Sequence, residues 1–231
     1  MTKPGHINAA FRSSFHNEIY FFVDDKYFLF ELFANERTSE RIFYELTPLR
    51  DGFKSLNHTI FGTYGIDCSF DTDNNEAYIF YENFCALIDY APHSDKDKII
   101  SGPKKISDAF PFLKGTVFEN GVDAAYRSTI GKEVYLFKGD KYARIDYGKN
   151  ELVQSIKKIT EGFPCFSGTI LENGVDAAFA CHIPNEVFFF KDEYYARVVV
   201  TPGATDDYIK NGVRKTLEFW PNLNGIKGLL D

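Results

Sequence analysis

Sulfur is scarce in this 231-residue chain, which has one methionine and four cysteines. The cysteines, Cys68, Cys85, Cys165 and Cys181, form no C-x-x-C pair, so their spacing excludes a zinc-finger or thioredoxin-like site. The low content also excludes a sulfur reserve. We expect four reduced, buried thiols, and we expect Cys68 and Cys85 to lie on facing strands of one unit, where they could form a disulfide.

Catalytic motifs are absent as well. The sequence contains no nucleophile elbow, phosphate-binding loop, H-E-x-x-H helix or dinucleotide fingerprint. Its five histidines, His6, His16, His58, His93 and His182, are scattered through terminal, turn and linker regions. We therefore predict that the protein is not an enzyme and requires no organic cofactor.

Excess positive charge and long apolar runs are both lacking. The formal net charge is −7 and the pI is about 5.3, whereas binding to nucleic acid requires clustered Lys and Arg that displace counterions from phosphates. No apolar run approaches the length of a membrane span, and the residues after Met1, Thr-Lys-Pro-Gly, are not typical of a signal peptide. We expect a cytosolic protein with no nucleic-acid or membrane partner.

What the chain does contain is one unit written four times. The sequence ENGVDAAYRSTIGKEVYLFKGDKYARIDY begins at Glu119, and ENGVDAAFACHIPNEVFFFKDEYYARV repeats most of it from Glu172. Looser copies open at Ile7 and Ile66. A polar residue marks each copy at intervals of 59, 56 and 53 residues, a spacing typical of solenoids and propellers, and these markers are Asn8, Asp67, Asp123 and Asp176.

Each copy predicts three strands and a closing segment. A short strand of small residues such as DAAY is followed by an apolar strand and, after a tight turn, by an alternating strand. The closing segment fits either a fourth strand or a single helical turn. The end copies of an open stack would be more polar than the middle copies, because they cap the stack. The end copies here are no more polar than the middle ones, so closure into a ring is favoured.

We therefore predict an all-β, four-bladed β-propeller with one repeat per blade and short helical turns between blades. A single domain covers residues 1–231, with repeats of about 4–62, 63–118, 119–171 and 172–231. The 24 Phe and 14 Tyr residues are expected to pack mainly between the blades.

The repeat also resembles a known family. The run aliphatic-Asp-Ala-Ala-aromatic, followed by Glu-Val-Tyr-Leu-Phe-Lys-Gly and Tyr-Ala-Arg, is similar to the hemopexin repeat, and essentially the whole chain resembles the legume seed albumin-2 family. The resemblance implies a hemopexin fold, a location in the cytosol of seed tissue, ions in the central channel, and a small ligand, either a polyamine such as spermine or haem.

The four markers are the predicted metal site. Small residues begin the leading strands, so four backbones can meet around one axis, and carbonyl oxygens at Asn8, Asp67, Asp123 and Asp176 can converge there beside three carboxylates. Calcium accepts six to eight such oxygens, with sodium as an alternative ion. The resemblance implies a chloride ion two residues deeper, at the amides of Ala10, Ser69, Ala125 and Ala178. The alternative for the markers is a cap, in which each side chain bonds its own backbone at a turn between blades.

A second series of carboxylates opens the second strand of each copy, at Glu18, Glu76, Glu133 and Glu186. We expect structural pairing for this series, with a ligand-binding role as the less favoured interpretation. His16 and His182 fall in comparable turns and are the candidate donors for haem. A seed reserve protein and a carbohydrate-binding, lectin-like protein remain alternatives to a small-ligand binder, and a symmetric homodimer is expected to cover outer apolar surface.

Overall fold

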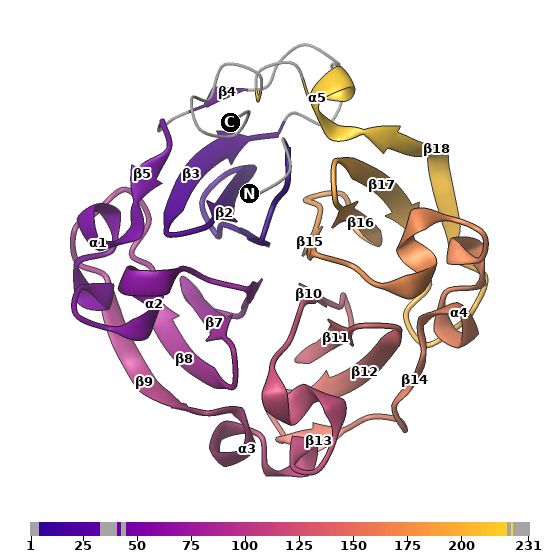
Figure 1. Cartoon of the computed structure of the whole chain (residues 1–231), viewed down its shortest axis with the longest axis horizontal. Helices are drawn as coiled ribbons and strands as arrows, with labels where there is room; N and C mark the ends of the chain where they lie inside the picture. Colours follow the sequence, from indigo (N-terminus) through magenta and orange to yellow (C-terminus); the bar gives the residue numbers. More distant parts are fainter. Residues whose placement is uncertain (1–4, 33–40, 43–44, 221–222, 224–231) are drawn as a thin grey trace.

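Four antiparallel sheets are arranged around one axis (Figure 1). The computed structural model describes residues 5–32, 41–42, 45–220 and 223, and the predicted outer limits of the first and last repeats, residues 4 and 231, lie outside this range. Each sheet falls within one repeat, and its strands follow chain order from the axis outward. The predicted four-bladed β-propeller is therefore confirmed.

The blades have the same three inner strands. They are, in blade 1, β1 (Ala9–Arg12), β2 (Glu18–Val23) and β3 (Lys26–Glu31); in blade 2, β6 (Cys68–Asp71), β7 (Glu76–Tyr81) and β8 (Phe84–Asp89); in blade 3, β10 (Ala124–Arg127), β11 (Glu133–Lys138) and β12 (Lys141–Asp146); and in blade 4, β15 (Ala177–Ala180), β16 (Glu186–Lys191) and β17 (Tyr194–Val199).

The closing segments contain both of the alternatives that the sequence left open. An outer strand comes first, and it is continuous in blades 2 and 4 but divided into two short pieces in blades 1 and 3. These strands are β9 (Lys98–Lys105), β18 (Tyr208–Lys215), β4 (Arg41–Ile42) with β5 (Thr47–Pro48), and β13 (Glu151–Leu152) with β14 (Lys157–Lys158).

A helical turn follows each outer strand. These turns are α1 (Leu49–Gly52), α3 (Ile106–Ala109), α4 (Ile159–Gly162) and α5 (Thr216–Phe219). Short helices lead into the next blade: η1 (Lys54–Leu56) with α2 (Ile60–Tyr64), η2 (Pro111–Leu113) with η3 (Val117–Asn120), and η4 (Pro164–Phe166) with η5 (Ile170–Asn173). Within the described part of the chain, no helix is long and apolar enough to cross a membrane.

The ring closes through its innermost strands. Strand β1 contacts both β6 and β15, and β10 contacts the same two strands from the other side. The first and last blades are therefore neighbours, as the absence of polar end copies predicts.

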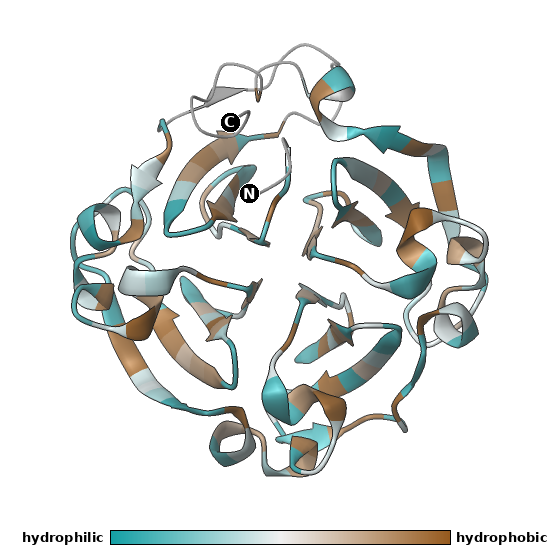
Figure 2. Cartoon of the chain, viewed as in Figure 1, coloured by the Kyte–Doolittle hydropathy of each residue, from teal (hydrophilic) through white to brown (hydrophobic). Residues whose placement is uncertain are grey.

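Four apolar cores fill the spaces between neighbouring blades. One core joins Phe21 of blade 1 to Phe179 and Trp220 of blade 4, with Phe21 meeting Phe179 edge-to-face at 5.6 Å. The other three join blades 1 and 2, 2 and 3, and 3 and 4. Hydrophobic residues accordingly concentrate on the strands, while many peripheral loops are hydrophilic (Figure 2). Packing between the blades thus accounts for most of the aromatic residues.

The expectation that Cys68 and Cys85 face each other is wrong. Strand β7 lies between their strands, and Phe80 of β7 pairs with both cysteines. Neighbouring strands are about 4.8 Å apart, so the two Cα atoms are separated by more than the roughly 7 Å that a disulfide tolerates. All four thiols are free. Cys68, Cys85 and Cys181 are buried as expected, whereas Cys165 is only half-buried. Burial raises the pKa of Cys85 to about 12.

Two buried aspartates in corresponding loops differ in their partners. In blade 2, Asp97 accepts the amides of Lys54 and Ser55 at 3.0 and 2.8 Å. Asp207 of blade 4 faces the corresponding turn of blade 3, where Pro164 has no N–H to donate. It accepts the amide of Thr201 at 2.6 Å, and burial raises its pKa to about 6.

We expect Asp207→Asn to stabilise the protein at pH 7.5 by about 2 kcal/mol, because the wild-type carboxylate must be charged there in a buried site. The pKa of Asp207 in the folded state lies above its ordinary value of 3.8, so this penalty disappears as the pH falls from above 6 towards 4. Asp97→Asn, which loses charge-assisted bonds, should destabilise the protein at both pH values. Melting temperatures at pH 7.5 and 5 measure both effects, and equal shifts for the two variants would contradict this account.

Candidate functional site

The register of the innermost strands directs specific backbone groups at the axis. Ser13 donates its amide to the Glu18 carbonyl at 2.7 Å, and Ala9 pairs with Phe22. Residues of an antiparallel strand alternate between bonding the neighbouring strand and pointing away from it. Ala9 and Ser13 bond β2, so the amide of Ala10, the residue after Ala9, points away from β2 and towards the axis. A trans peptide places each C=O opposite the next N–H, so the Asn8 carbonyl points towards the axis too.

The same register recurs in all four blades. Thr72, Ser128 and Cys181 donate to Glu76, Glu133 and Glu186 as Ser13 does to Glu18. The carbonyls of Asn8, Asp67, Asp123 and Asp176 therefore form one layer, and the amides of Ala10, Ser69, Ala125 and Ala178 form the next. This geometry suits the predicted cation and anion layers, and the occupancy of either layer by an ion stays a prediction.

The side chains of the four markers have a capping role. Each accepts an amide from the hairpin turn between the second and third strands of its own blade, at 2.7 to 2.9 Å: Asn8 from Asp24, Asp67 from Glu82, Asp123 from Gly139, and Asp176 from Asp192. The predicted local cap, with each side chain bonding its own backbone at a turn between blades, is therefore wrong: the capped turn lies 15 or 16 residues further along the chain, within the same blade.

Two lysines that the sequence reasoning missed share the caps of blades 3 and 4. The Nζ atom of Lys138 lies 2.5 Å from Asp123 Oδ1, and Lys191 Nζ lies 2.5 Å from Asp176 Oδ1. The signal was the repeated Phe-Lys that ends the second strand in these two copies. Blades 1 and 2 have Val23 and Tyr81 at this place.

Asp67 consequently has no lysine from its own blade. Burial raises the pKa of Asp67, and the charges of Glu82 and Asp123 raise it further, while the Glu82 amide and Lys138 lower it. The net direction is upward, so the negative charge in this sector of the ring is incompletely balanced.

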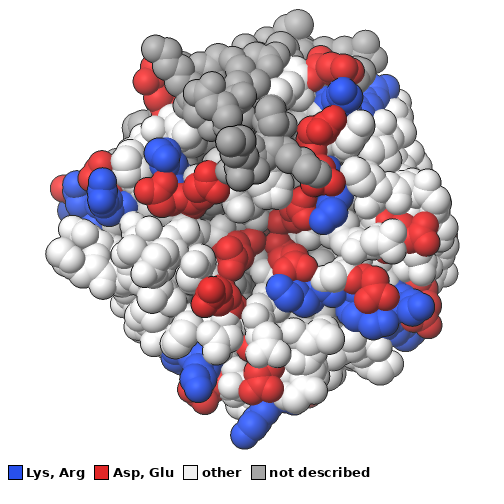
Figure 3. Space-filling model, viewed as in Figure 1, with Lys and Arg blue, Asp and Glu red and all other residues white. Residues whose placement is uncertain are grey.

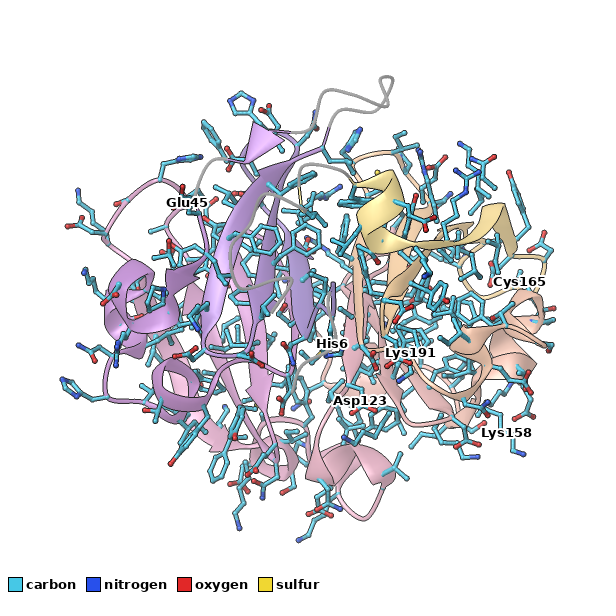
Figure 4. All side chains as sticks on the ribbon, turned by 45° about the horizontal axis from the view of Figure 1, so that its top comes forward. His6, Glu45, Asp123, Lys158, Cys165 and Lys191 are labelled. Carbon is cyan, nitrogen blue, oxygen red and sulfur yellow. The ribbon has the colours of Figure 1, made fainter. Side chains whose placement is uncertain are left out.

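The markers line one hollow, which we call the acidic mouth. Asn8, Asp67, Asp123, Asp176 and His6 surround about 180 Å³ of space. Acidic side chains gather at the centre of this face (Figure 3), and His6, Asp123 and Lys191 lie close together in the tilted view of Figure 4. His6 Nδ1 is 3.5 Å from Asp176 Oδ2. The sequence did not predict this contact, because the histidines are scattered along the chain.

The glutamate series lies away from the acidic mouth and is mostly paired. Glu133 accepts Arg144 Nε at 2.6 Å, Glu186 pairs with Arg197 and Lys210, and the buried Glu18 contacts His93 Nε2 at 2.7 Å. Glu76 is half-buried on β7. These partners support the structural interpretation of the series.

The two candidate haem donors are not brought together with the acidic mouth. His16 is an exposed turn residue with φ of 52° that packs against Phe15. His182 lines a separate hollow between blades 3 and 4. Among the described residues, no group of three or more His, Cys, Asp or Glu side chains is placed to hold a metal ion. An ion at the acidic mouth would thus depend on the inward carbonyls.

Fold and repeat together define a four-bladed propeller of the hemopexin class, and the Hemopexin family model matches residues 122–165. The chain belongs to the albumin-2 family: it is 69% identical over 227 residues to albumin-2 of Pisum sativum, covering 98% of each chain.

Two solved structures from Cicer arietinum have the same fold. One is a plant albumin showing hemagglutination, 65% identical, with a TM-score of 0.94 over 97% of this chain and 100% of that one. The other is a plant lectin with two metal binding sites, 66% identical, with a TM-score of 0.94 over 97% of this chain and 99% of that one. This chain is accordingly a hemopexin-fold seed albumin.

Proposed function

We propose that the protein binds a small organic cation, a linear polyamine such as spermine, at the acidic mouth, above a hard cation held by the inward carbonyls. The observation that supports this proposal is that Asp67, Asp123 and Asp176 line one hollow. Negative charge focused at such an opening raises the local concentration of a cation and its association rate. The role is one of binding rather than catalysis.

The shape of the site favours a polyamine over haem. A polyamine is thin, and its ammonium groups can bind carboxylates and carbonyls in turn. Haem requires a broad apolar slot with an axial donor, and His16 and His182 both lie away from the acidic mouth.

Titration calorimetry with spermine tests this proposal. We expect binding at low ionic strength whose affinity falls steeply as salt is added, because ion pairs near the surface are screened over about 8–10 Å at ordinary ionic strength. Putrescine, with fewer charges, should bind more weakly. Absence of heat with spermine at low salt would reject the polyamine.

The hard cation has its own expected result. Calcium that binds only the folded state stabilises it by RT ln(1 + [L]/Kd), about 2.7 kcal/mol at a hundredfold excess over Kd. Adding excess EDTA should therefore lower the melting temperature, and calcium should restore it. An unchanged melting temperature, with no metal detected by elemental analysis, would reject the calcium site but leave the polyamine proposal standing.

Carbohydrate binding is the second candidate, because one relative from Cicer arietinum shows hemagglutination and another is a lectin. Exposed aromatic side chains that could stack on sugars include Tyr64 and Tyr208, which lie 62% and 56% exposed. Red-cell agglutination with and without spermine separates the two candidates. Agglutination that sugars inhibit and spermine does not would favour the lectin.

A further inference from the structure

The innermost strands differ at their far ends, away from the acidic mouth. The last residues of β1, β6, β10 and β15 are Arg12, Asp71, Arg127 and Ala180. Asp71 is buried and accepts the backbone amide of Arg12, and its Oδ2 lies 3.9 Å from Arg127 NH1. Charged side chains therefore occupy three of the four corresponding places, and only blade 4 has a methyl group.

A hollow of about 310 Å³ lies at Ala180, which we call the blade-4 hollow. It opens between the β10–β11 turn and the β15–β16 turn, and Arg12 and Arg127 line it from blades 1 and 3. Ala180 leaves room that an arginine, as in blades 1 and 3, would fill.

Both arginines keep donors that could serve a ligand. Arg12 NH1 donates to the Cys181 carbonyl at 3.2 Å, and Arg127 donates to the Thr72 carbonyl and to Asp73. A guanidinium has five N–H groups in a planar fork that matches carboxylate and phosphate. The one carboxylate lining the hollow, Glu186, is already paired with Arg197 and Lys210. Asp71 and Asp73 in turn pair with Arg127, so four cations and three carboxylates surround the hollow and its net charge is positive by one.

His182 adds a donor without a partner. Its Nδ1 lies 3.5 Å from Cys181 Sγ, and its buried Nε2 has no hydrogen-bond partner. Burial raises the pKa of the Cys181 thiol, and burial together with Arg197 and Arg12 lowers the pKa of His182, so both groups are neutral near pH 7. In the tautomer in which the thiol donates to Nδ1, Nε2 carries the ring proton and can donate to a ligand. A buried polar atom left unpaired calls for an explanation, and a ligand is one.

We propose that the blade-4 hollow binds the carboxylate or phosphate group of a small organic anion. Arg12, Arg127 and the N–H of His182 would contact the oxyanion, and the apolar wall of Tyr126, Pro184 and Val187 would contact the rest of the molecule. This site is chemically opposite to the acidic mouth and does not depend on it.

Calorimetry and two-dimensional NMR with phenyl phosphate, benzoate and inorganic phosphate test the proposal at low salt. We expect shifts of Ala180 and His182 amides, and tighter binding of an aromatic anion than of inorganic phosphate. Preference for phenyl phosphate or for benzoate identifies the oxyanion. Absence of binding by all three probes would overturn the proposal.

Two variants locate the binding. Arg12→Gln should weaken it about tenfold or more, because a hydrogen bond to a charged group contributes about 1.5–3 kcal/mol. Ala180→Arg should abolish it by filling the hollow, while the melting temperature stays close to that of wild type. The control Lys157→Gln/Lys158→Gln removes two exposed charges of β14 and should leave binding unchanged. Equal losses in the control and in Arg12→Gln would show an unspecific charge effect and reject the site.

Discussion

Gly65→Ala is expected to destabilise the protein by about 3–5 kcal/mol. Gly65 adopts φ of +107°, and a Cβ atom there would lie 2.1 Å from the carbonyl oxygen of Asp24. This oxygen belongs to the β2–β3 turn, which Asn8 fixes by accepting the Asp24 amide at 2.9 Å. The backbone of blade 1 can therefore move away only by disrupting that cap. Urea unfolding followed by circular dichroism measures the change in the free energy of unfolding.

Gly115→Ala is the matched control. Gly115 also has positive φ, +76°, but no atom lies within 4 Å of the Cβ position. Only the conformational penalty of about 1 kcal/mol applies there. If the two variants lost equal stability, close approach of the two blades would not be the reason for glycine at position 65.

Glycine also precedes the markers of blades 3 and 4 by two residues. Gly121 and Gly174 have φ of +140° and +152°, and their Cβ positions lie 3.2 and 3.4 Å from carbonyl oxygens of the preceding blade. Blade 1 has His6 at this place, and His6 lines the acidic mouth. Glycine at this place thus allows consecutive blades to approach closely beside the acidic mouth. Blade 1, which has His6 instead, adds an imidazole side chain to the mouth.

The ring could be predicted from the sequence because its determinants are local to each copy. The markers recur with the repeat, and small residues such as Ala124 and Ala125 indicate strands that must come close to an axis. The cysteine prediction failed because Cys68 and Cys85 are separated by a hairpin strand, and only the order of strands in the sheet shows that β7 lies between them.

Other features depend on register or on contacts between blades. Lys138 reaches Asp123 because two strands return the chain to the same end of the blade after 15 residues. The blade-4 hollow results from a side chain that is missing in one copy, Ala180, and its walls come from three blades. Comparison of the four copies shows that Ala180 is smaller than its counterparts. The volume of the hollow beside it depends on how three blades pack, which the sequence of one copy does not determine.

Charge changes at the acidic mouth should alter spermine affinity in both directions. Asp67→Asn is expected to weaken binding most among single neutralisations, because Asp67 has no lysine of its own blade to balance it, whereas Asp123 and Asp176 are paired with Lys138 and Lys191. Partly exposed ion pairs contribute about 0.2–1 kcal/mol each, so each single loss should be roughly two- to fivefold and the triple Asn variant roughly ten- to hundredfold. Asparagine oxygens can still accept the hairpin amides, so the blades should stay folded.

Removing the lysines should strengthen binding. Lys138 and Lys191 occupy carboxylate oxygens that an ammonium group of spermine would otherwise contact, so Lys191→Gln frees Asp176 and is expected to raise the affinity roughly two- to fivefold. Binding should also weaken as the pH falls through the raised pKa of Asp67, because protonation removes its charge.

Asp108→Asn, which removes an exposed carboxylate of the helical turn α3, is the control for net charge. Calorimetric titrations of this series at one ionic strength decide the matter: if Lys191→Gln weakens binding, or if Asp108→Asn matches Asp67→Asn, spermine is not bound at the acidic mouth.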